Sequence, residues 1–177
     1  MERTTIRRLA AALIIAVALA GITLSTVLAQ PPDALTAAKA ATARFQNVAQ
    51  AVAAGYTLPP EGPLHECISG ASGAMGFHYI NGALLSGDEA AVADPARPEA
   101  LVYAPDKHGK LRLVAAEYVI FKSDLPAGAG VPTLFGEPFM DMTLNPFGLP
   151  PFWALHAWVW EDNPDGTLEP FNPAVSC

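Results

Sequence analysis

The sequence predicts an α+β domain, in which one long N-terminal amphipathic helix packs on an antiparallel sheet or partly open barrel. Three observations predict this class. A helical stretch opens the folded part of the chain, strand-like segments follow it over about residues 75–162, and helices do not alternate with these strands. A parallel sheet of βαβ units requires such alternation, so we expect an antiparallel sheet.

The predicted helix covers about residues 34–54. This segment is rich in alanine and lacks proline and glycine, and its larger apolar residues, among them Phe45 and Val52, recur at helical spacing. Asp33 is a suitable N-cap, and Gly55 stands where a C-cap glycine is common. The polar face is only weakly basic, which favours packing on a sheet over binding to a membrane surface or a partner.

Strands are predicted where apolar and aromatic residues cluster between turn signals. The turn Asp106–Gly109 separates two of them and predicts a hairpin. The stretches before residue 76 and from 125 to 151 are rich in proline and glycine and are expected to be irregular. The expected strands are residues 76–80, 101–103, 110–122 and 152–161.

The first thirty residues have the pattern of an export signal. A basic start with Arg7 and Arg8 precedes an apolar run, and small residues before Gln30 mark a cleavage site after Ala29. We therefore expect a signal peptide at residues 1–29 and a single mature domain at 30–177, located in the periplasm or outside the cell. The alternative is a membrane anchor that is not cleaved, because the apolar run is nearly long enough to span a bilayer.

The charge of the mature chain excludes one class of partner. Cleavage would remove three of the ten basic residues and one of the seventeen acidic residues, which leaves a net charge of −9. A chain of this charge repels phosphate backbones, and no basic stripe offsets it. We therefore expect no nucleic-acid partner, and no membrane partner once the signal is removed.

The chain has two cysteines, Cys67 and Cys177, and both belong to the exported part. Oxidation is permitted outside the cytoplasm, so the simplest prediction is one disulfide between them. A catalytic thiol is the weaker alternative, because a rigid site is hard to build around the C-terminal Cys177.

Three of the predicted strands each carry one polar residue in apolar surroundings: His78, Glu117 and His156. Side chains alternate between the two faces of a strand, so Glu117 is expected to share a face with Leu111, Leu113, Ala115, Val119 and Phe121. A carboxylate in such a stripe is costly unless it is paired or bound to a ligand. If the three strands are neighbours, the two imidazoles and the carboxylate converge on one interior point.

Two imidazoles and one carboxylate suit a divalent transition metal such as zinc, iron or copper. Without a metal, the same residues could serve as an acid–base pair, as an anchor for a ligand, or as a buried hydrogen-bonded network with a purely structural role. No local metal motif of the H-E-x-x-H or C-x-x-C type decides between these alternatives.

An aromatic pocket is expected around this point, with Trp158, Trp160 and Tyr79 in its wall and a small molecule as its ligand. Trp158 and Trp160 would share a strand face with His156, although tryptophans at strand spacing more often fill a core. The other histidines, His65 and His108, are expected in a surface loop and in a solvated turn, and Glu66 in the same loop as His65.

Several blocks of the chain resemble an uncharacterised family of exported bacterial proteins. The resemblance supplies no activity, substrate or cofactor, but it favours a common role for the three polar strand residues that its blocks contain. The blocks are residues 41–45, 73–81 (GAMGFHYIN), 94–99, 113–119 (LVAAEYV), 155–160 (LHAWVW) and 163–166 (NPDG).

The sequence thus predicts a small exported domain that binds a divalent metal through His78, Glu117 and His156. The alternative is a non-catalytic domain that binds a small ligand, or a structural envelope protein with a buried polar network. Whether the domain is an enzyme, and in which oligomeric state it exists, is left open.

Overall fold

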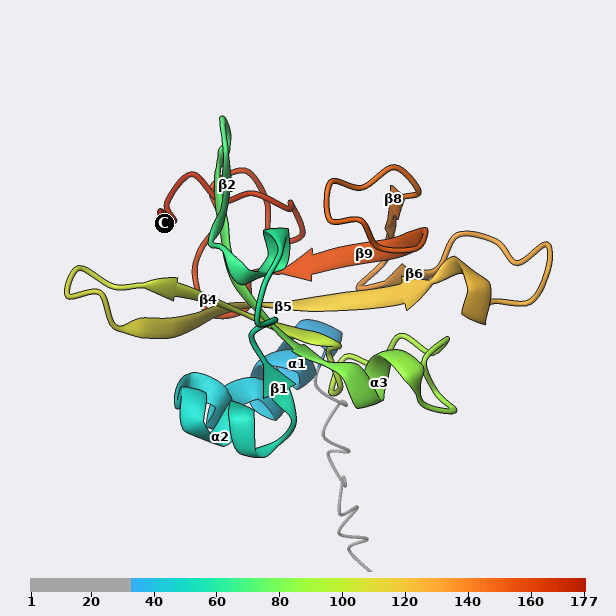
Figure 1. Cartoon of the computed structure of the whole chain (residues 1–177), viewed down its shortest axis with the longest axis horizontal. Coiled ribbons are helices and arrows are strands. Elements are labelled where there is room, and N and C mark those ends of the chain that lie inside the picture. The colour runs from blue at the N-terminus through green and yellow to red at the C-terminus, as the bar shows by residue number, and fades with distance from the viewer. Residues whose placement is uncertain (1–32) are drawn as a thin grey trace, which may run out of the picture. The chain divides into compact units, whose positions relative to one another are not determined.

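A computed structural model describes residues 33–177 of the chain, so the predicted signal peptide and its cleavage site lie outside the described residues. The described residues group as one compact unit. The described part combines short helices with a mainly antiparallel sheet, in agreement with the predicted α+β class (Figure 1). No helix in this part is long and apolar enough to cross a membrane.

The predicted single N-terminal helix is instead three short pieces. They are the α-helix α1 (Ala34–Thr42), the 3₁₀ helix η1 (Ala43–Gln46) and the α-helix α2 (Val48–Ala53). The break lies at Asn47, whose backbone is extended with φ −95° and ψ 109°, and whose side chain accepts a hydrogen bond from the Ala49 N–H. Asparagine competes with the helix by this kind of local bond, so it begins a new helix here.

The main sheet of the described residues has seven strands, and neighbouring strands in it pair in antiparallel fashion. Its order is β1 (Tyr56–Thr57), β3 (Gly73–Asn81), β4 (Ala100–Pro105), β5 (Leu111–Phe121), β9 (Phe152–Ala157) and β8 (Met140–Met142), with β2 (Ile68–Gly70) paired to β3. The predicted hairpin is confirmed as β4 and β5. The remaining elements are η2 (Pro63–His65), α3 (Gly82–Ser86), η3 (Lys122–Asp124), β6 (Thr133–Leu134) and β7 (Glu137–Pro138).

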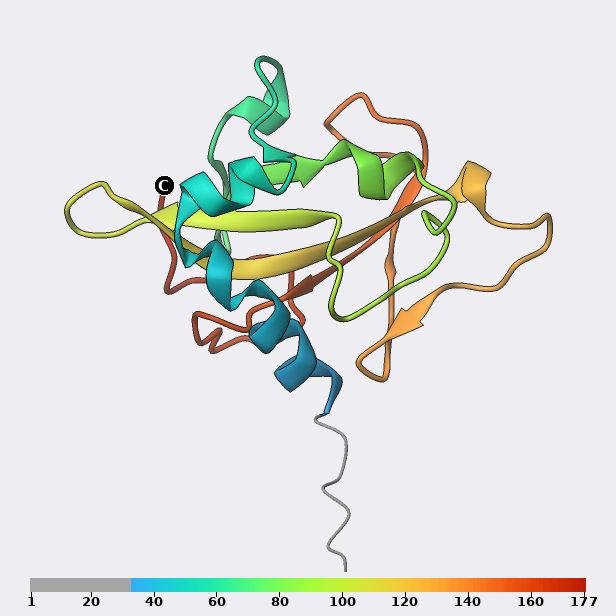
Figure 2. The same ribbon diagram turned by 90° about the horizontal axis from the view of Figure 1, so that it is seen from below.

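The two faces of the sheet have different coverings. The helices α1 and α2 lie against one face, as both views show (Figures 1 and 2), and they pack there on Leu101, Tyr103 and Tyr118. The opposite face carries the three polar strand residues, and the β2–β3 hairpin and the segment before β9 lie on that side (Figure 1). The helix face is the domain's main apolar core, which leaves the other face free to line a cavity.

A β-bulge in β5 decides which residues share a face with Glu117. Tyr103 pairs with Leu113, whereas its neighbour Val102 pairs with Ala115, so β5 has one additional residue, Val114. Leu113 consequently packs on the helix side with Tyr103. The prediction that Leu111 and Leu113 share a face with Glu117 is therefore wrong, because the inserted residue shifts the alternation by one. Val119 and Phe121 lie on the Glu117 side, as predicted.

The predicted disulfide between Cys67 and Cys177 is present and joins positions 110 residues apart. It attaches the C-terminal segment to the strand pair β2–β3, and an isolated bridge between Ala74 and Asn172 adds a second attachment. A structural disulfide is typical of an oxidising compartment, which agrees with the predicted location outside the cytoplasm.

Candidate metal centre

The sheet brings together the three residues that the sequence singled out. His78 lies in β3, Glu117 in β5 and His156 in β9. Glu117 and His156 are direct partners in the β5–β9 register. Their position relative to each other is therefore fixed by backbone hydrogen bonds.

His78 reaches the other two residues from the far side of β4, which runs between β3 and β5. The residue of β4 opposite Glu117 is Ala100, and the residue opposite His78 is Val102. Alanine carries only a methyl group, so the imidazole and the carboxylate can meet above it. The group therefore depends on a small residue in a strand that contributes no ligand.

The side-chain atoms are within reach of a single ion. The Nε2 atom of His78 lies 3.4 Å from Nε2 of His156 and 3.4 Å from Oε2 of Glu117. One potential ligand atom from each residue lies within 4.8 Å of the others, so the group could hold a metal ion. Zinc bound tetrahedrally at about 2.0–2.1 Å separates its ligand atoms by about 3.3 Å. Both distances to His78 Nε2 agree with that separation.

The three groups are nearly removed from solvent. Both histidine side chains are 3% exposed and the Glu117 side chain is 12% exposed. Burial lowers the pKa of His78 to about 4 and that of His156 to about 3. Burial, with a smaller contribution from the Glu99 carboxylate, raises the pKa of Glu117 to about 8. Near neutral pH the metal-free site therefore holds two neutral imidazoles and a largely protonated carboxyl group.

The second nitrogen of each imidazole differs in its surroundings. Nδ1 of His156 lies 3.7 Å from Oε1 of Glu117, so the same carboxyl group contacts both histidines. Nδ1 of His78 is buried and has no hydrogen-bond partner among the described residues. The Gly76 backbone favours the protonated His78 ring, although burial outweighs it. A buried polar atom without a partner costs free energy.

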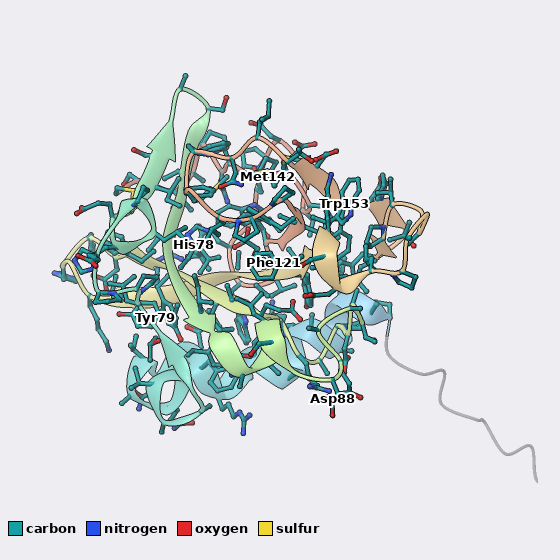
Figure 3. The ribbon with its side chains drawn as sticks, turned by 45° about the vertical axis from the view of Figure 1, so that its right-hand side comes forward. His78, Tyr79, Asp88, Phe121, Met142 and Trp153 are labelled. Atoms are coloured by element: carbon teal, nitrogen blue, oxygen red, sulfur yellow. A yellow bond between two sulfur atoms is a disulfide. The ribbon has the colours of Figure 1, made fainter. Side chains whose placement is uncertain are left out.

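The group opens on an apolar cavity of about 370 Å³. The cavity lies within the size range of small-molecule sites. Phenylalanines form much of its wall, namely Phe121, Phe147, Phe152 and Phe171. Every methionine after Met1 also lines it: Met75, Met140 and Met142. Figure 3 shows His78, Phe121 and Met142 on the same side of the sheet, with Tyr79 toward the helices.

The three aromatic residues predicted for the pocket wall do not line this cavity. Tyr79 lies on the helix side and packs edge-on against Tyr103, with ring centroids 4.9 Å apart. Trp160 also turns away, and its indole N–H donates to the Thr42 hydroxyl. Trp158 stacks beside His156 at 6.3 Å but belongs to a separate apolar cluster. The strand ends at Ala157, which removes the face that the two tryptophans were expected to share with His156.

One further acidic residue was not found by the sequence reasoning. Glu99 precedes β4 and lines both the large cavity and a smaller one of about 50 Å³ beside Arg97. The Glu99 carboxylate accepts a hydrogen bond from the Val119 N–H at 3.0 Å, and burial raises its pKa to about 7. Glu99 follows two prolines, at 95 and 98, and directly precedes a short apolar strand. This local sequence gives no signal that its side chain is buried.

The remaining candidates stay on the surface, as the sequence predicted. His65 is exposed, and its Nδ1 lies 2.7 Å from the Pro59 carbonyl oxygen in the same loop. Glu66 and His108 are also exposed, and the His108 N–H donates to the Asp106 carboxylate within the predicted turn. None of the three joins the His78, Glu117 and His156 group.

Comparison of the chain with protein-family models, with curated proteins and with solved structures gives no match. The function of the site has therefore to be argued from its own geometry and chemistry.

Proposed function

We propose that this protein is a small exported domain that binds a divalent metal ion through His78, Glu117 and His156. The observation that carries the proposal is the pair of 3.4 Å distances from His78 Nε2 to His156 Nε2 and Glu117 Oε2. Three potential ligands from three strands face one point, and two of their three separations match the separation expected around a bound ion. Zinc, iron and copper are the candidates, because these ions accept imidazole and carboxylate ligands.

The electrostatics of the site support an ion over a metal-free network. In the metal-free site the Glu117 carboxyl group stays largely protonated near neutral pH, and a divalent cation bonded to it and to both imidazoles would compensate the cost of ionising it there. The same ion would stabilise the charged form of Glu117, whose pKa burial otherwise raises to about 8. The unpartnered Nδ1 of His78 would keep its proton while Nε2 binds the ion.

Three protein ligands leave a position on a four-coordinate ion for water or for a small molecule. A bound divalent ion lowers the pKa of its water, which is the chemistry that hydrolytic metal sites use. The cavity of about 370 Å³ beside the three residues would give such a ligand its space. Binding of a small molecule without catalysis is the second candidate function, and the apolar wall of the same cavity favours it.

Export is proposed from two observations of different kinds. Residues 1–29 have the composition of a signal peptide, and Cys67 and Cys177 form a disulfide. N-terminal sequencing of protein from an export-competent host should begin at Gln30. A first residue of Met1 would contradict the cleavage.

Elemental analysis of the mature protein from such a host tests the metal proposal. We expect about one ion per chain in the wild type and in His108→Ala, and a loss of most of it in His156→Ala. His108 is the matched control, because it is an exposed histidine in a turn. The proposal is wrong if folded wild-type protein contains no metal and binds none when titrated with zinc, iron, copper or manganese.

A further inference from the structure

We infer that the cavity beside the three residues binds an apolar molecule that ends in a carboxylate, with the carboxylate on the metal ion. This inference rests on the proposed function, since it requires the ion. It adds the class of ligand, which is a small monoanion with an aliphatic or aromatic body.

The wall of the cavity defines the body of the ligand. Seventeen of its 22 lining residues are apolar, and the five polar ones are Ser69, Glu99 and the three proposed metal ligands. A polar body would lose hydrogen bonds with water and find few replacements in such a wall. A cavity of about 370 Å³ is at the small end of ligand sites. It suits a molecule with the dimensions of a medium-length fatty acid.

The methionines indicate that the body can vary in shape. Met75, Met140 and Met142 come from three places in the chain and all line the cavity. Methionine is unbranched and polarizable, so it adapts to different apolar surfaces. Together with the phenylalanines, these side chains favour a hydrocarbon body over a ligand of one fixed outline.

The charges define the end of the ligand. Two neutral imidazoles and one carboxylate leave a divalent ion with one uncompensated positive charge. A single carboxylate on the ligand would make the centre neutral, which is the favourable state beside an apolar wall. Glu99 also lines the cavity, but below about pH 7 it is mainly protonated and therefore adds little charge.

Without the ion, the same cavity should reject an anion. Its described lining contains no lysine or arginine. A carboxylate would be desolvated there without any cation to pair with. Binding of the anion must therefore depend on the metal, and binding of a neutral molecule of the same length must not.

Calorimetric titration with octanoate and with octanol at pH 6.5 tests this dependence. The samples are the mature protein in its zinc-loaded and metal-free forms. We expect octanoate to bind the zinc form at least about tenfold more tightly than the metal-free form, and octanol to bind both forms within about threefold. Equal octanoate affinity for the two forms, or no octanoate binding to a zinc-loaded protein, would overturn the inference.

A cavity-filling variant separates the two proposals. Ala154 lines the cavity without belonging to the three proposed ligands. We expect Ala154→Phe to keep its zinc and to lose at least about tenfold in octanoate affinity. The exposed Ala129 supplies the matched control, and Ala129→Phe should bind both zinc and octanoate as the wild type does.

The zinc titration of the same samples reports on the proposed function by itself. Zinc binding without octanoate binding would support the metal site and overturn the inferred class of ligand. Octanol binding without zinc binding overturns both the metal site and the inference, and leaves an apolar cavity with another role. Octanoate affinity unchanged in a folded Ala154→Phe protein would place the ligand elsewhere and overturn the inference.

Discussion

His78 and Glu117 approach to 3.4 Å, measured from Nε2 to Oε2, although a complete strand separates the strands that carry them. The strand between them is β4, and Ala100 is its residue opposite Glu117. Ala100 is buried and lines the cavity. The candidate metal centre therefore depends on the absence of a large side chain at a position that provides no ligand.

A larger side chain at this position should disrupt the centre without unfolding the domain. We expect Ala100→Leu to reduce zinc affinity at least about tenfold, because the side chain would extend between the imidazole and the carboxyl group into existing cavity space. Ala100→Ser, which is nearly as small as the wild type, should keep most of the affinity. Zinc titration and circular dichroism of both variants measure the effect. Wild-type affinity in a folded Ala100→Leu protein would contradict this account.

Metal binding should release about one proton at pH 7. The pKa of Glu117 is raised to about 8, so the metal-free site holds a proton there that the ion must displace, whereas both histidines are already neutral. Zinc titration in buffers of different ionisation enthalpy measures this release. We expect the Glu117 contribution to approach zero near pH 9, where Glu117 is ionised before the ion arrives, so that any release that remains there comes from water on the ion. A release that does not change between pH 7 and pH 9 would show that another group supplies the proton.

Glu99 should make the domain less stable as the pH rises from about 4.5 to about 7. Burial raises the pKa of Glu99 in the folded state to about 7 from its ordinary value of 4.5, so the folded state holds more protons than the unfolded state in this window. The free energy of unfolding then falls as the pH increases, by up to about 3 kcal/mol, and becomes flat above the folded pKa.

Replacement of Glu99 by glutamine tests that loss. Glu99→Gln keeps an oxygen that can accept the hydrogen bond from the Val119 N–H, but it cannot ionise. Relative to the wild type, it should therefore gain stability between pH 4.5 and pH 7. Urea denaturation at several pH values measures the difference. A difference that stays constant across this range would refute the assignment.

Gly73 should tolerate no side chain. Its φ is +116°, and a Cβ atom there would lie 2.2 Å from the backbone oxygen of Asn172, in the segment that the Ala74–Asn172 bridge holds. We expect Gly73→Ala to destabilise the domain by more than about 2 kcal/mol. Gly109 is the control: its φ is +77° and a Cβ would meet no atom within 4 Å, so Gly109→Ala should cost only about 1 kcal/mol. Thermal denaturation compares the two variants, and equal losses would mean that the close approach to Asn172 is unimportant.

The residues of the candidate site could be predicted from sequence because each signal is local. His78, Glu117 and His156 each interrupt an apolar strand, and the strand pattern is visible within a few residues. The order of the strands could not be predicted in this way, because β5 pairs with β9 across the irregular segment that separates residues 121 and 152. The role of Ala100 follows from that order alone, and nothing in its own neighbourhood indicates it.

The aromatic wall was predicted incorrectly for a related reason. A continued strand would have placed Trp158 and Trp160 beside the histidine, but the chain leaves the sheet after Ala157. The backbone N–H of Trp158 then donates to the Thr167 carbonyl, and the backbone N–H of Trp160 donates to the Val114 carbonyl. Neither acceptor residue belongs to the β5–β9 register. The phenylalanines that replace them come from segments such as 146–149 and 170–171, whose proline-rich sequence predicts irregular backbone but not where it packs.

We expect two parts of the domain to differ in their sensitivity to reducing agents. Cys67 adjoins Ile68, and Cys177 ends the segment that carries Phe171, so the disulfide and the Ala74–Asn172 bridge together join two walls of the cavity. The three proposed metal ligands lie instead on strands joined by their own backbone hydrogen bonds. Reduction of the disulfide should therefore weaken the binding of an apolar ligand under conditions in which the metal ion stays bound. In a compartment whose redox state changes, such a domain would retain its metal ion and exchange its ligand.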